Sequence, residues 1–364
     1  MKKIVLLLSI FLISCNEEGL VQNPPQKTVV DNTSNQLAFV AVECSAIDNS
    51  WAIDASYISG GASGIGGIPA INAPEFIRID QVDYLENEEL IGILEINNRV
   101  YFLPHRIMDK HEVLNFEGTT YTFCPLTGTS VSFLSPEALL VSGTLLNSNL
   151  IMIDSEFESY WSQMLGIGIK GSSSCNELTA DHTFETTYGT AKSLYPDALV
   201  LSPNTGFDKN YSNLPLSSLQ NATANPLFPV EPYEEKFSNF ERTLAVPAGN
   251  GALIATFDSF EECDRILFGE IDGNELFIIG CKEANYLTSF HLITNNSNSI
   301  TKPIQQVKIG LYADANGNQF DLLGNIKAGP LTGEKLVSTQ SYIGYWFAVG
   351  SMYDRFLFMD ENAF

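Results

Sequence analysis

The feature that most constrains this chain is an internal duplication. Segments 89–107 and 242–260 each contain two strand-like runs joined by an asparagine-containing turn. Segments 112–124 and 265–281 each contain a hairpin with an acid-glycine turn, and in both the second strand runs to a cysteine. The offset between the copies stays between 153 and 157 residues in these segments, and self-similarity at a nearly fixed offset is the sequence signature of repeated structure. The sequence therefore predicts two structurally similar halves.

Each half also carries one aromatic-rich helical pattern near its end. Apolar residues recur there at i, i+4, i+7 and i+11, which is one face of a helix. They are Phe184, Tyr188, Ala191 and Tyr195 in the first half, and Tyr342, Trp346, Val349 and Tyr353 in the second. These patterns predict helices near 183–194 and 342–353 with their aromatic faces in the core. The rest consists of short alternating runs separated by turns. The predicted class is α+β, mostly antiparallel β, in two pseudo-repeated halves that each have a strand-rich core and one main helix.

Composition divides the chain into five predicted parts. They are a lipoprotein signal peptide (1–14), a flexible tether leading into the folded region (15–49), a first half carrying the candidate site (50–210), a Pro-, Asn- and Ser-rich connector (211–239), and a second, degenerate structural half (240–364).

The N-terminus predicts export and lipid anchoring. Two lysines precede an apolar run from Ile4 to Ile13, which is typical of a secretory signal. The run is shorter than the roughly 20 residues of a membrane-spanning helix. Its end, "LISC", resembles a bacterial lipobox, in which the cysteine becomes the acylated N-terminus. We therefore expect lipidated Cys15 to attach the protein to a membrane of the cell envelope. Asn16 stands where an aspartate would signal inner-membrane retention, so the expected place is the outer membrane, periplasmic or surface-exposed.

Net charge argues against two classes of partner. The formal net charge is −24. Nucleic acids and anionic lipid surfaces would repel such a chain, because the electrostatic attraction that drives their binding would be reversed. We therefore expect no nucleic-acid partner.

The cysteines and histidines exclude several familiar sites. The chain has 6 cysteines and 4 histidines. It contains no CxxC and no HxxxH, so thioredoxin-like, zinc-ribbon and zinc-protease sites have no support. With Cys15 lipidated, five cysteines remain in an oxidising compartment. We expect Cys124 to be the unpaired one, since Cys44, Cys175, Cys263 and Cys281 are enough for two bridges.

The candidate site is a hairpin over 111–130, "HEVLNFEGTTYTFCPLTGTS". Pairing of Phe116 with about Thr119 places position 111 opposite position 124, so His111 and Cys124 are expected to be neighbours. Pro125 favours extended backbone at Cys124, and the glycine that follows permits a tight turn whose N–H groups could face the thiol. The candidate catalytic residues are Cys124, His111 and Asn149. The candidate ligand-binding residues are Asn147, Ser162, Gln163, Thr127, Gly128 and Thr129.

The second half lacks these residue types. Asp264 stands near the place of the histidine, and "CKEANY" follows the second-half cysteine without proline or glycine. Two interpretations remain open: an active half with a structural half, or two structural halves that have drifted apart.

Several blocks in the first half resemble one bacterial family. "GGIPAINAPEF", "HEVLN", "CPLTGTS", "NSNLIMID" and "YWSQ" occur in this order, and "GPLTGEKL" and "SYIGYWFA" follow near the end. Together they resemble domain of unknown function 3179, over about 50–357. The chain departs from that family's pattern at Lys110 (usually tryptophan), Thr127 (often a second cysteine) and Ile153 (usually tyrosine). Thr127 rules out a two-cysteine redox or metal pair, and the resemblance implies no reaction.

Three functions remain open, and whether the protein is an enzyme is among the open points. A Cys–His pair with an amide orienter would suit thiol-dependent acyl transfer or hydrolysis. Soft ligands at Cys124, His111 and Met108 would suit copper. We predict no cofactor, with copper as the alternative. A lipoprotein that binds a small ligand, or a non-catalytic envelope scaffold, needs neither. An enzyme requires an accessible Cys124 with a lowered pKa, hydrogen-bonded to His111.

Overall fold

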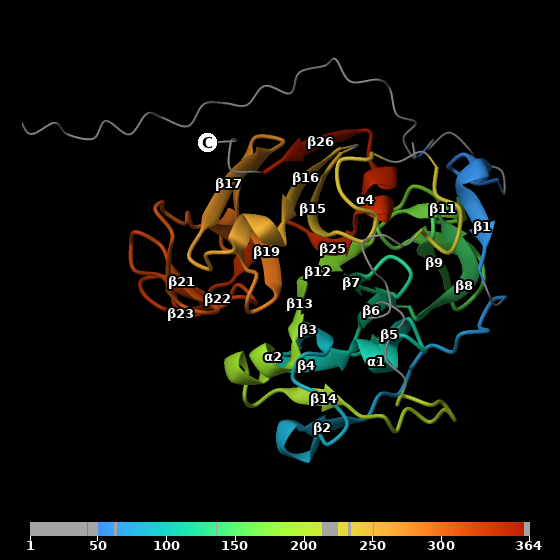
Figure 1. Ribbon diagram of the computed structural model, residues 1–364, viewed down its shortest axis with the longest axis horizontal. Coiled ribbons are helices and arrows are strands. Elements are labelled where there is room, and N and C mark those ends of the chain that lie inside the picture. The colour runs from blue at the N-terminus through green and yellow to red at the C-terminus, as the bar shows by residue number, and fades with distance from the viewer. Residues whose placement is uncertain are drawn as a thin grey trace, which may run out of the picture.

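A computed structural model describes residue 42 and residues 50–61, 64–135, 137–212, 225–231, 234–249 and 251–359. The predicted signal peptide, the lipidation site Cys15 and almost all of the tether lie outside the described residues. The described chain is mostly antiparallel β with a few short helices, which confirms the predicted fold class (Figure 1). Within these ranges, no helix is long and apolar enough to cross a membrane.

The first half contains three sheets. In spatial order, the first is β13 (Thr183–Thr187), β3 (Leu90–Ile96), β4 (Arg99–Pro104), β14 (Leu199–Leu201) and β2 (Phe76–Arg78). The second is β12 (Thr179–Asp181), β7 (Thr129–Leu134), β6 (Thr119–Cys124) and β5 (Val113–Phe116). The third is β1 (Ile58–Gly60), β8 (Leu139–Leu146), β9 (Asn149–Asp154), β10 (Ser159–Ser162) and β11 (Gly168–Gly171). The helices are α1 (His105–Met108) and α2 (Tyr188–Leu194), with 3-10 turns η1 (Ala55–Tyr57) and η2 (Ile79–Gln81).

The second half repeats this plan. Its first sheet is β25 (Tyr342–Tyr345), β15 (Arg242–Ala248), β16 (Gly251–Thr256) and β26 (Arg355–Phe358). Its second is β17 (Ile266–Ile271), β18 (Asn274–Cys281), β19 (Tyr286–Thr294) and β24 (Leu336–Ser338). Its third is β20 (Gln305–Lys308), β21 (Leu311–Ala313), β22 (Gln319–Asp321) and β23 (Ile326–Ala328). The main helix is α4 (Trp346–Met352), and η3 (Phe257–Phe260) is a 3-10 turn.

The duplication is confirmed by the directions of the strands in addition to their order. In the first half, β13 runs antiparallel to β3, and β14 runs parallel to β4. In the second half, β25 runs antiparallel to β15, and β26 runs parallel to β16. A strand, helix and parallel strand thus close the first sheet of each half in the same way.

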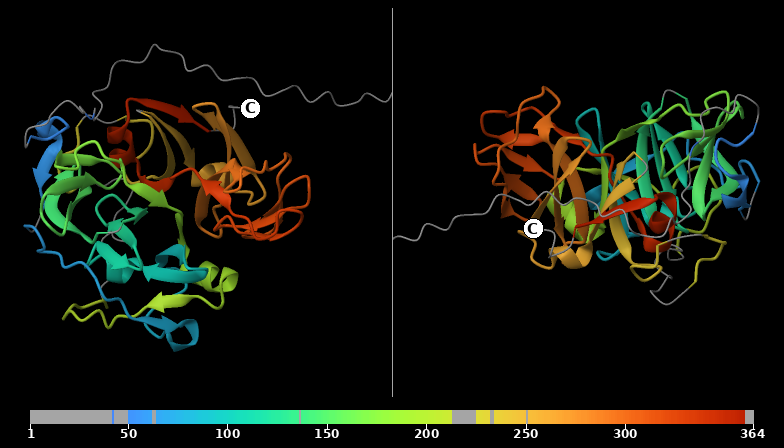
Figure 2. Two further views of the ribbon diagram at one scale, coloured as in Figure 1. Left: turned by 180° about the vertical axis from the view of Figure 1, so that it is seen from behind. Right: turned by 90° about the horizontal axis from the view of Figure 1, so that it is seen from above.

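The halves pack reciprocally and share their cores. Strand β13 of the first half packs against β19, and the corresponding β25 of the second half packs against β7. Such an exchange of equivalent contacts is what a two-fold relation produces. One large apolar cluster joins Cys124 and Met152 to Trp346, and another joins Phe102 and Phe184 to second-half residues. The halves lie side by side in both views of Figure 2.

The two main helices begin later than predicted. Residues 183–187 and 342–345 are strands, and the helices start at Tyr188 and Trp346. Three of the five residues in β13 are threonines, whose β-branched side chains favour strands, and β13 pairs along its whole length with β3. The aromatic faces are in the core as expected, with Tyr188 4% and Trp346 0% exposed.

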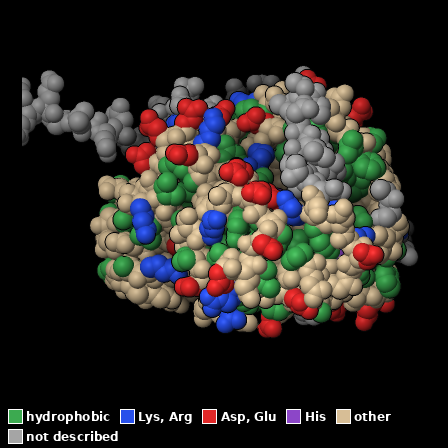
Figure 3. Space-filling view, turned by 60° about the horizontal axis from the view of Figure 1, so that its bottom comes forward, with side chains coloured by type: hydrophobic (Ala, Val, Ile, Leu, Met, Phe, Trp, Pro, Cys, Tyr) green, Lys and Arg blue, Asp and Glu red, His purple; other side chains and the backbone are tan. Residues whose placement is uncertain are grey.

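The acidic character is spread over the surface on the face that Figure 3 shows. Acidic and basic side chains are interspersed there, without one large area of either sign. Across the chain, acidic residues outnumber basic ones by 43 to 19. The face drawn in Figure 3 therefore has no large basic surface.

Candidate functional site

The hairpin β5–β6 has the predicted register, but it begins too late to include His111. Phe116 pairs with Thr119, and Val113 pairs with Thr122. Glu112 adopts a left-handed backbone conformation with φ 60°, which an extended strand does not accommodate. The chain therefore turns at Glu112, and the register cannot be extended to position 111.

The ring nitrogens of His111 bind residues other than Cys124. Its Nδ1 lies 2.8 Å from the carbonyl oxygen of Pro69, and its Nε2 lies 2.5 Å from the hydroxyl of Tyr211. That hydroxyl also hydrogen-bonds the hydroxyl of Thr205 at 2.6 Å. Burial lowers the pKa of His111, so the neutral imidazole is favoured. The expected hydrogen bond between His111 and Cys124 is not formed, because both ring nitrogens are bound elsewhere.

Cys124 carries a free thiol, as expected from the cysteine count. Cys263 and Cys281 form a disulfide, and Cys175 is also disulfide-bonded. Cys124 is only 1% exposed, and its Sγ lies 3.8 Å from the carbonyl oxygen of Ser148. Burial raises the pKa of the Cys124 thiol to about 11, and the charge of Glu112 adds to the shift. The lowered pKa and the accessibility that a catalytic thiol requires are therefore not found at Cys124.

Glu112, rather than His111, is the ionisable neighbour that affects the pKa of the thiol. This side chain is 9% exposed, and burial raises its pKa to about 8, with a further contribution from Asp109. At neutral pH the site therefore holds a protonated carboxyl group near a neutral thiol. Successive residues of an extended strand point to opposite faces, so the sequence predicts that the Glu112 side chain points away from that of His111. Nothing in the sequence pattern revealed the left-handed residue that reverses this arrangement.

Three of the predicted ligand-binding or catalytic side chains meet, but they bind one another. The Asn149 amide donates to Thr127 Oγ1 at 3.0 Å and to Gln163 Oε1 at 2.8 Å. The Gln163 amide donates to Thr122 Oγ1 at 2.9 Å and to the carbonyl of Thr129 at 3.0 Å. All five residues are 0% exposed. A fully satisfied buried network of this kind rigidifies a core.

The remaining predicted residues also lie in packed surroundings. Ser162 is 0% exposed, and its Oγ accepts a hydrogen bond from the backbone N–H of Leu165 at 3.3 Å. Gly128 has φ 60°, and a Cβ there would lie 2.9 Å from the ring of Tyr345. Asn147 is buried, and its amide nitrogen has no hydrogen-bond partner among the described residues. Met108, the third soft ligand considered for copper, is also 0% exposed. Within the described ranges, no group of three or more His, Cys, Asp or Glu side chains is placed to hold a metal ion.

We expect native Cys124 to resist alkylation. With a pKa near 11, the thiolate fraction at pH 7 is about 300-fold smaller than for a free thiol of pKa about 8.5. Iodoacetamide should therefore modify Cys124 only as fast as the protein opens, and the rate should jump in urea. Mass spectrometry of the time course measures this. Rapid labelling in the native protein, abolished by His111→Ala, would instead support a Cys–His pair.

A second polar cluster, not expected from the sequence, joins the halves. His105 Nε2 lies 3.0 Å from Glu185 Oε2, and Arg242 Nη2 lies 3.3 Å from Glu185 Oε1. Ser130 Oγ lies 3.3 Å from Glu185 and accepts a hydrogen bond from Tyr121 at 2.8 Å. Burial raises the pKa of Glu185, but His105 and Arg242 outweigh it, so the pKa falls below its usual value. Glu185 is therefore a buried carboxylate held by both halves.

This cluster exists in one copy of the duplication only. When the two halves are aligned by the register of their strands, apolar residues of the second half occupy the positions of the polar ones. Ile278 corresponds to Tyr121, Leu287 to Ser130 and Ile343 to Glu185. The space for the Tyr121 hydroxyl comes from Gly92, where a Cβ would lie 2.0 Å from it. No sequence pattern indicated this cluster, because its members are single polar residues far apart in the chain.

The cluster does not have the geometry of a hydrolase triad. Glu185 and the Ser130 hydroxyl, at 3.4 Å, share the same His105 nitrogen, while Nδ1 is buried without a hydrogen-bond partner among the described residues. A triad places the acid on one nitrogen and the nucleophile on the other. His105 is 1% and Glu185 3% exposed, so substrate has no access. The cluster is best described as a buried ionic link between the halves.

The accessible feature is a cleft of about 1310 Å³ between the halves. The first half contributes the β3–β4 turn and α2, and the second contributes the β20–β21 turn and residues from β22 and β23. Its lining mixes charge and apolar surface and includes Arg99, Leu194, Tyr195, Lys308, Ile309 and Asp321. Figure 1 shows α2 beside the sheet that contains β21, β22 and β23. Ligand pockets of proteins commonly combine these properties.

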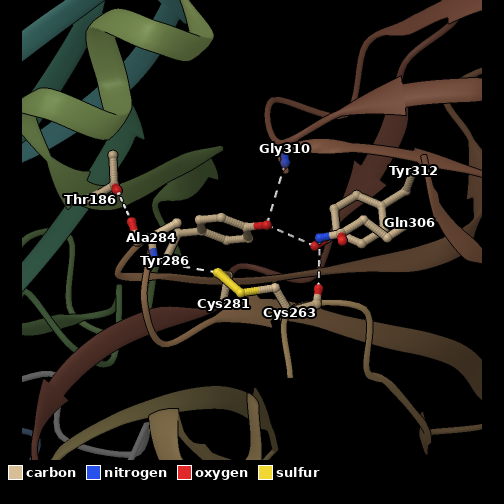
Figure 4. The surroundings of a disulfide bond; sticks show 8 residues. All are labelled: Thr186, Cys263, Cys281, Ala284, Tyr286, Gln306, Gly310 and Tyr312. Carbon is tan, nitrogen blue, oxygen red and sulfur yellow. Dashed lines mark hydrogen bonds between the residues drawn. A yellow bond between two sulfur atoms is a disulfide. The ribbon is translucent and has the colours of Figure 1, made fainter. Parts of the chain in front are cut away.

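The second-half wall of the cleft is braced by the disulfide and a tyrosine pair (Figure 4). The hydroxyls of Tyr286 and Tyr312 hydrogen-bond at 2.9 Å, and the N–H of Gly310 donates to Tyr286 at 3.4 Å. Gln306 donates to the carbonyl of Cys263 at 2.7 Å, beside the Cys263–Cys281 bridge. These contacts therefore fix the position of the β20–β21 turn, which lines the cleft.

The floor of the cleft contains polar atoms with spare hydrogen-bonding capacity. The Tyr195 hydroxyl is buried beside the backbone N–H groups of Leu322 and Leu323 without a well-formed hydrogen bond in the described part of the chain, and burial raises its pKa well above the usual value. Asp321 Oδ2 lies 3.1 Å from Lys327 Nζ, although that contact lacks hydrogen-bond geometry. Buried polar groups normally have partners, so orphaned ones at a cleft are suited to a ligand.

Comparison with known proteins places the chain in a family. Residues 65–356 match the family described as "Protein of unknown function (DUF3179)". The chain belongs to the DUF3179 family. The match spans both halves, so the duplicated architecture lies within the region that defines the family. Neither the curated proteins nor the solved structures contain a match to this chain.

Proposed function

We propose that this DUF3179 member is an exported, lipid-anchored binding protein of the cell envelope, with its ligand site in the cleft between the halves. The observation that carries the proposal is the cleft itself: about 1310 Å³, lined by both halves, with the orphaned hydroxyl of Tyr195 at its wall. Typical ligand pockets occupy about 300–1,000 Å³. The volume is thus sufficient for a ligand of drug size or larger.

Thiol-dependent acyl transfer or hydrolysis has less support. Cys124 is buried, its pKa is raised to about 11, and His111 hydrogen-bonds Pro69 and Tyr211. A catalytic thiol needs access and a stabilised thiolate. Copper binding at Cys124, His111 and Met108 is disfavoured by the same placement of His111, which directs its nitrogens elsewhere.

Filling the cleft should abolish ligand uptake. Ser193 is exposed and lines the cleft, so Ser193→Trp places an indole ring there without disturbing the core. We expect the apolar dye anilinonaphthalene sulfonate to bind the wild-type protein, and its fluorescence gain to fall by most of its value in the variant. Ser155→Trp, at an exposed turn outside the cleft, is the matched control. Equal dye binding by the two variants would contradict the proposed site.

Lipid anchoring is tested at Cys15. The wild-type protein should partition into the detergent phase of Triton X-114 and fractionate with membranes. Cys15→Ser should remain in the aqueous phase, because the acyl chains supply the membrane affinity, about 0.8 kcal/mol for each buried CH₂ group. Identical partitioning of both proteins into the aqueous phase would remove the anchor from the proposal.

A further inference from the structure

The duplication gives the cleft a counterpart on the other side of the molecule. Strands β8–β11 and β20–β23 have the same order, so the turn at 147–148 corresponds to the turn at 309–310. Helix α4 likewise corresponds to α2. The cleft lies between α2 and the turn at 309–310. Its counterpart is the groove between α4 and the turn at 147–148.

That second groove is filled by the chain's own connector. The hydroxyl of Ser148 donates to the carbonyl of Phe228 at 3.1 Å, on one wall. The backbone N–H of Glu234 donates to the carbonyl of Gly350 in α4 at 3.1 Å, on the other. Between them, Val230 is 6% exposed and belongs to the apolar cluster of α4. The yellow segment beside α4 in Figure 1 is this connector. The groove therefore holds a polypeptide by main-chain hydrogen bonds and an apolar side chain.

In the first half the equivalent groove is open. The chain segment that precedes β3 follows a different path from that of the connector, which precedes β15. Residues 76–78 form β2, which pairs with β14 at the edge of the sheet. The N–H groups of Tyr188 and Gly189 still bond to the carbonyls of Glu89 and Asn87, as those of Trp346 and Phe347 bond to Glu241 and Asn239. The two segments are thus equivalent close to the helix and diverge before it. The apolar walls remain exposed at the cleft, with Ile309 44% exposed.

We propose that the cleft binds an extended segment of another polypeptide, carrying an apolar side chain, as the connector is bound in the counterpart groove. This inference rests on the proposed function of the cleft. Ile309 and Leu194 supply apolar surface, while the Tyr195 hydroxyl and the Asp321 carboxylate, neither with all of its hydrogen-bonding capacity used, supply polar atoms for main-chain groups. Recognition of extended peptides commonly combines main-chain hydrogen bonds with side-chain pockets.

The ends of the described chain point to an occupant from another molecule. At the N-terminal side, the N–H of Ala52 bonds to the carbonyl of Ile169 in β11. At the C-terminal side, the N–H of Met359 bonds to the carbonyl of Ile254 in β16. None of these four residues lines the cleft. In Figure 1 β1 and β26, the first and last labelled strands, both lie away from α2.

The test uses the full mature chain made soluble by Cys15→Ser, with a phage-displayed library of random heptapeptides as probe. We expect enrichment of heptapeptides with apolar residues. The synthetic peptides should bind at least about tenfold more weakly to Ile309→Asp, because an apolar anchor at the cleft is lost. Val307→Asp is the matched control: Val307 is 50% exposed on the adjoining strand and lies outside the cleft lining. Thermal unfolding of both variants checks that the fold is kept.

Three outcomes would overturn the inference. One is no enrichment, and another is enriched peptides that bind both variants equally. The third is displacement of the selected peptides by a synthetic peptide of residues 17–49, which would assign the cleft to the chain's own tether. Dye binding that is lost in Ser193→Trp, in the absence of any peptide binding, would leave the ligand site standing and remove only the polypeptide as its ligand. Loss of both would remove both proposals.

Discussion

Glu112→Gln should make the folded protein more stable than wild type at pH 8, by on the order of 5 kcal/mol, with no such gain near pH 4. Burial raises the pKa of Glu112 from 4.5 to about 8. Below about pH 4.5 the carboxyl group is protonated in both folded and unfolded states. Between 4.5 and 8 only the folded state keeps the proton, so stability falls as pH rises through this window. A pKa difference of one between the two states corresponds to about 1.36 kcal/mol of stability. Glutamine has a similar shape and does not titrate.

The matched control for this prediction is Glu117→Gln. Glu117 lies in the turn of the same hairpin, also with a left-handed backbone at φ 51°, but its side chain is exposed. Urea unfolding at pH 4.5, 6 and 8 measures both variants beside wild type. The free-energy difference should grow with pH for Glu112→Gln only. Parallel pH profiles for wild type and Glu112→Gln would show that Glu112 is ionised in the folded protein.

Glu185→Ala should destabilise the protein by about 3–5 kcal/mol, because it leaves a buried ionic cluster without its carboxylate. Glu185 is 4% exposed at the side chain and binds His105 from its own half and Arg242 from the other. Arg242 also stacks over Phe257 at 4.7 Å and donates to Asn285 at 2.6 Å. Removal of Glu185 therefore leaves a cation held in place at the interface between the halves.

A double-mutant cycle separates the ionic contribution from lost packing. Glu185→Ala with Arg242→Ala should cost less than the sum of the single changes, because the double variant leaves no unpaired charge between them. Lys282→Ala is the control for an ion pair that is not buried. Lys282 and its partner Asp258 are 45% and 70% exposed at the side chain, so the cost should be within about 1 kcal/mol. Strict additivity of the two changes would show that the pair does not couple the halves.

Glu185, one of the residues changed in these experiments, lies at a position where the two halves differ. The first half carries Glu112, Cys124 and Glu185 in its interior, whereas Ile343 stands in the second half where Glu185 stands in the first. Buried ionisable groups lower stability unless they are paired, and no cation among the described residues lowers the pKa of Glu112. The first half therefore carries buried ionisable side chains at Glu112 and Glu185, whereas the accessible cleft is lined by both halves.

The sequence by itself determined the hairpin turns, the register of the β5–β6 hairpin and the buried faces of the main helices. The acid-glycine pair Glu117-Gly118 and the pair Asn97-Asn98 adopt the left-handed conformations that two-residue hairpin turns require. The register of β5 with β6 follows from that turn, and the offset between copies revealed the duplication. Burial of Tyr188 and Trp346 followed from helical periodicity. Each of these features depends on residues close together in the chain or on comparison of two segments, so no three-dimensional information is needed.

Tertiary structure decided the contents of the candidate site. One residue with positive φ, Glu112, turns His111 toward Tyr211, which lies 100 residues further along the chain. Glu185 meets Arg242, 57 residues away, only because the halves pack reciprocally. The cleft exists because the segment before β3 leaves the groove that the connector fills on the other side. Sequence period specifies which face of a strand or helix is buried, but it does not specify which distant element covers that face. Partners for buried polar groups, and the cavities left between packed elements, are properties of that long-range packing.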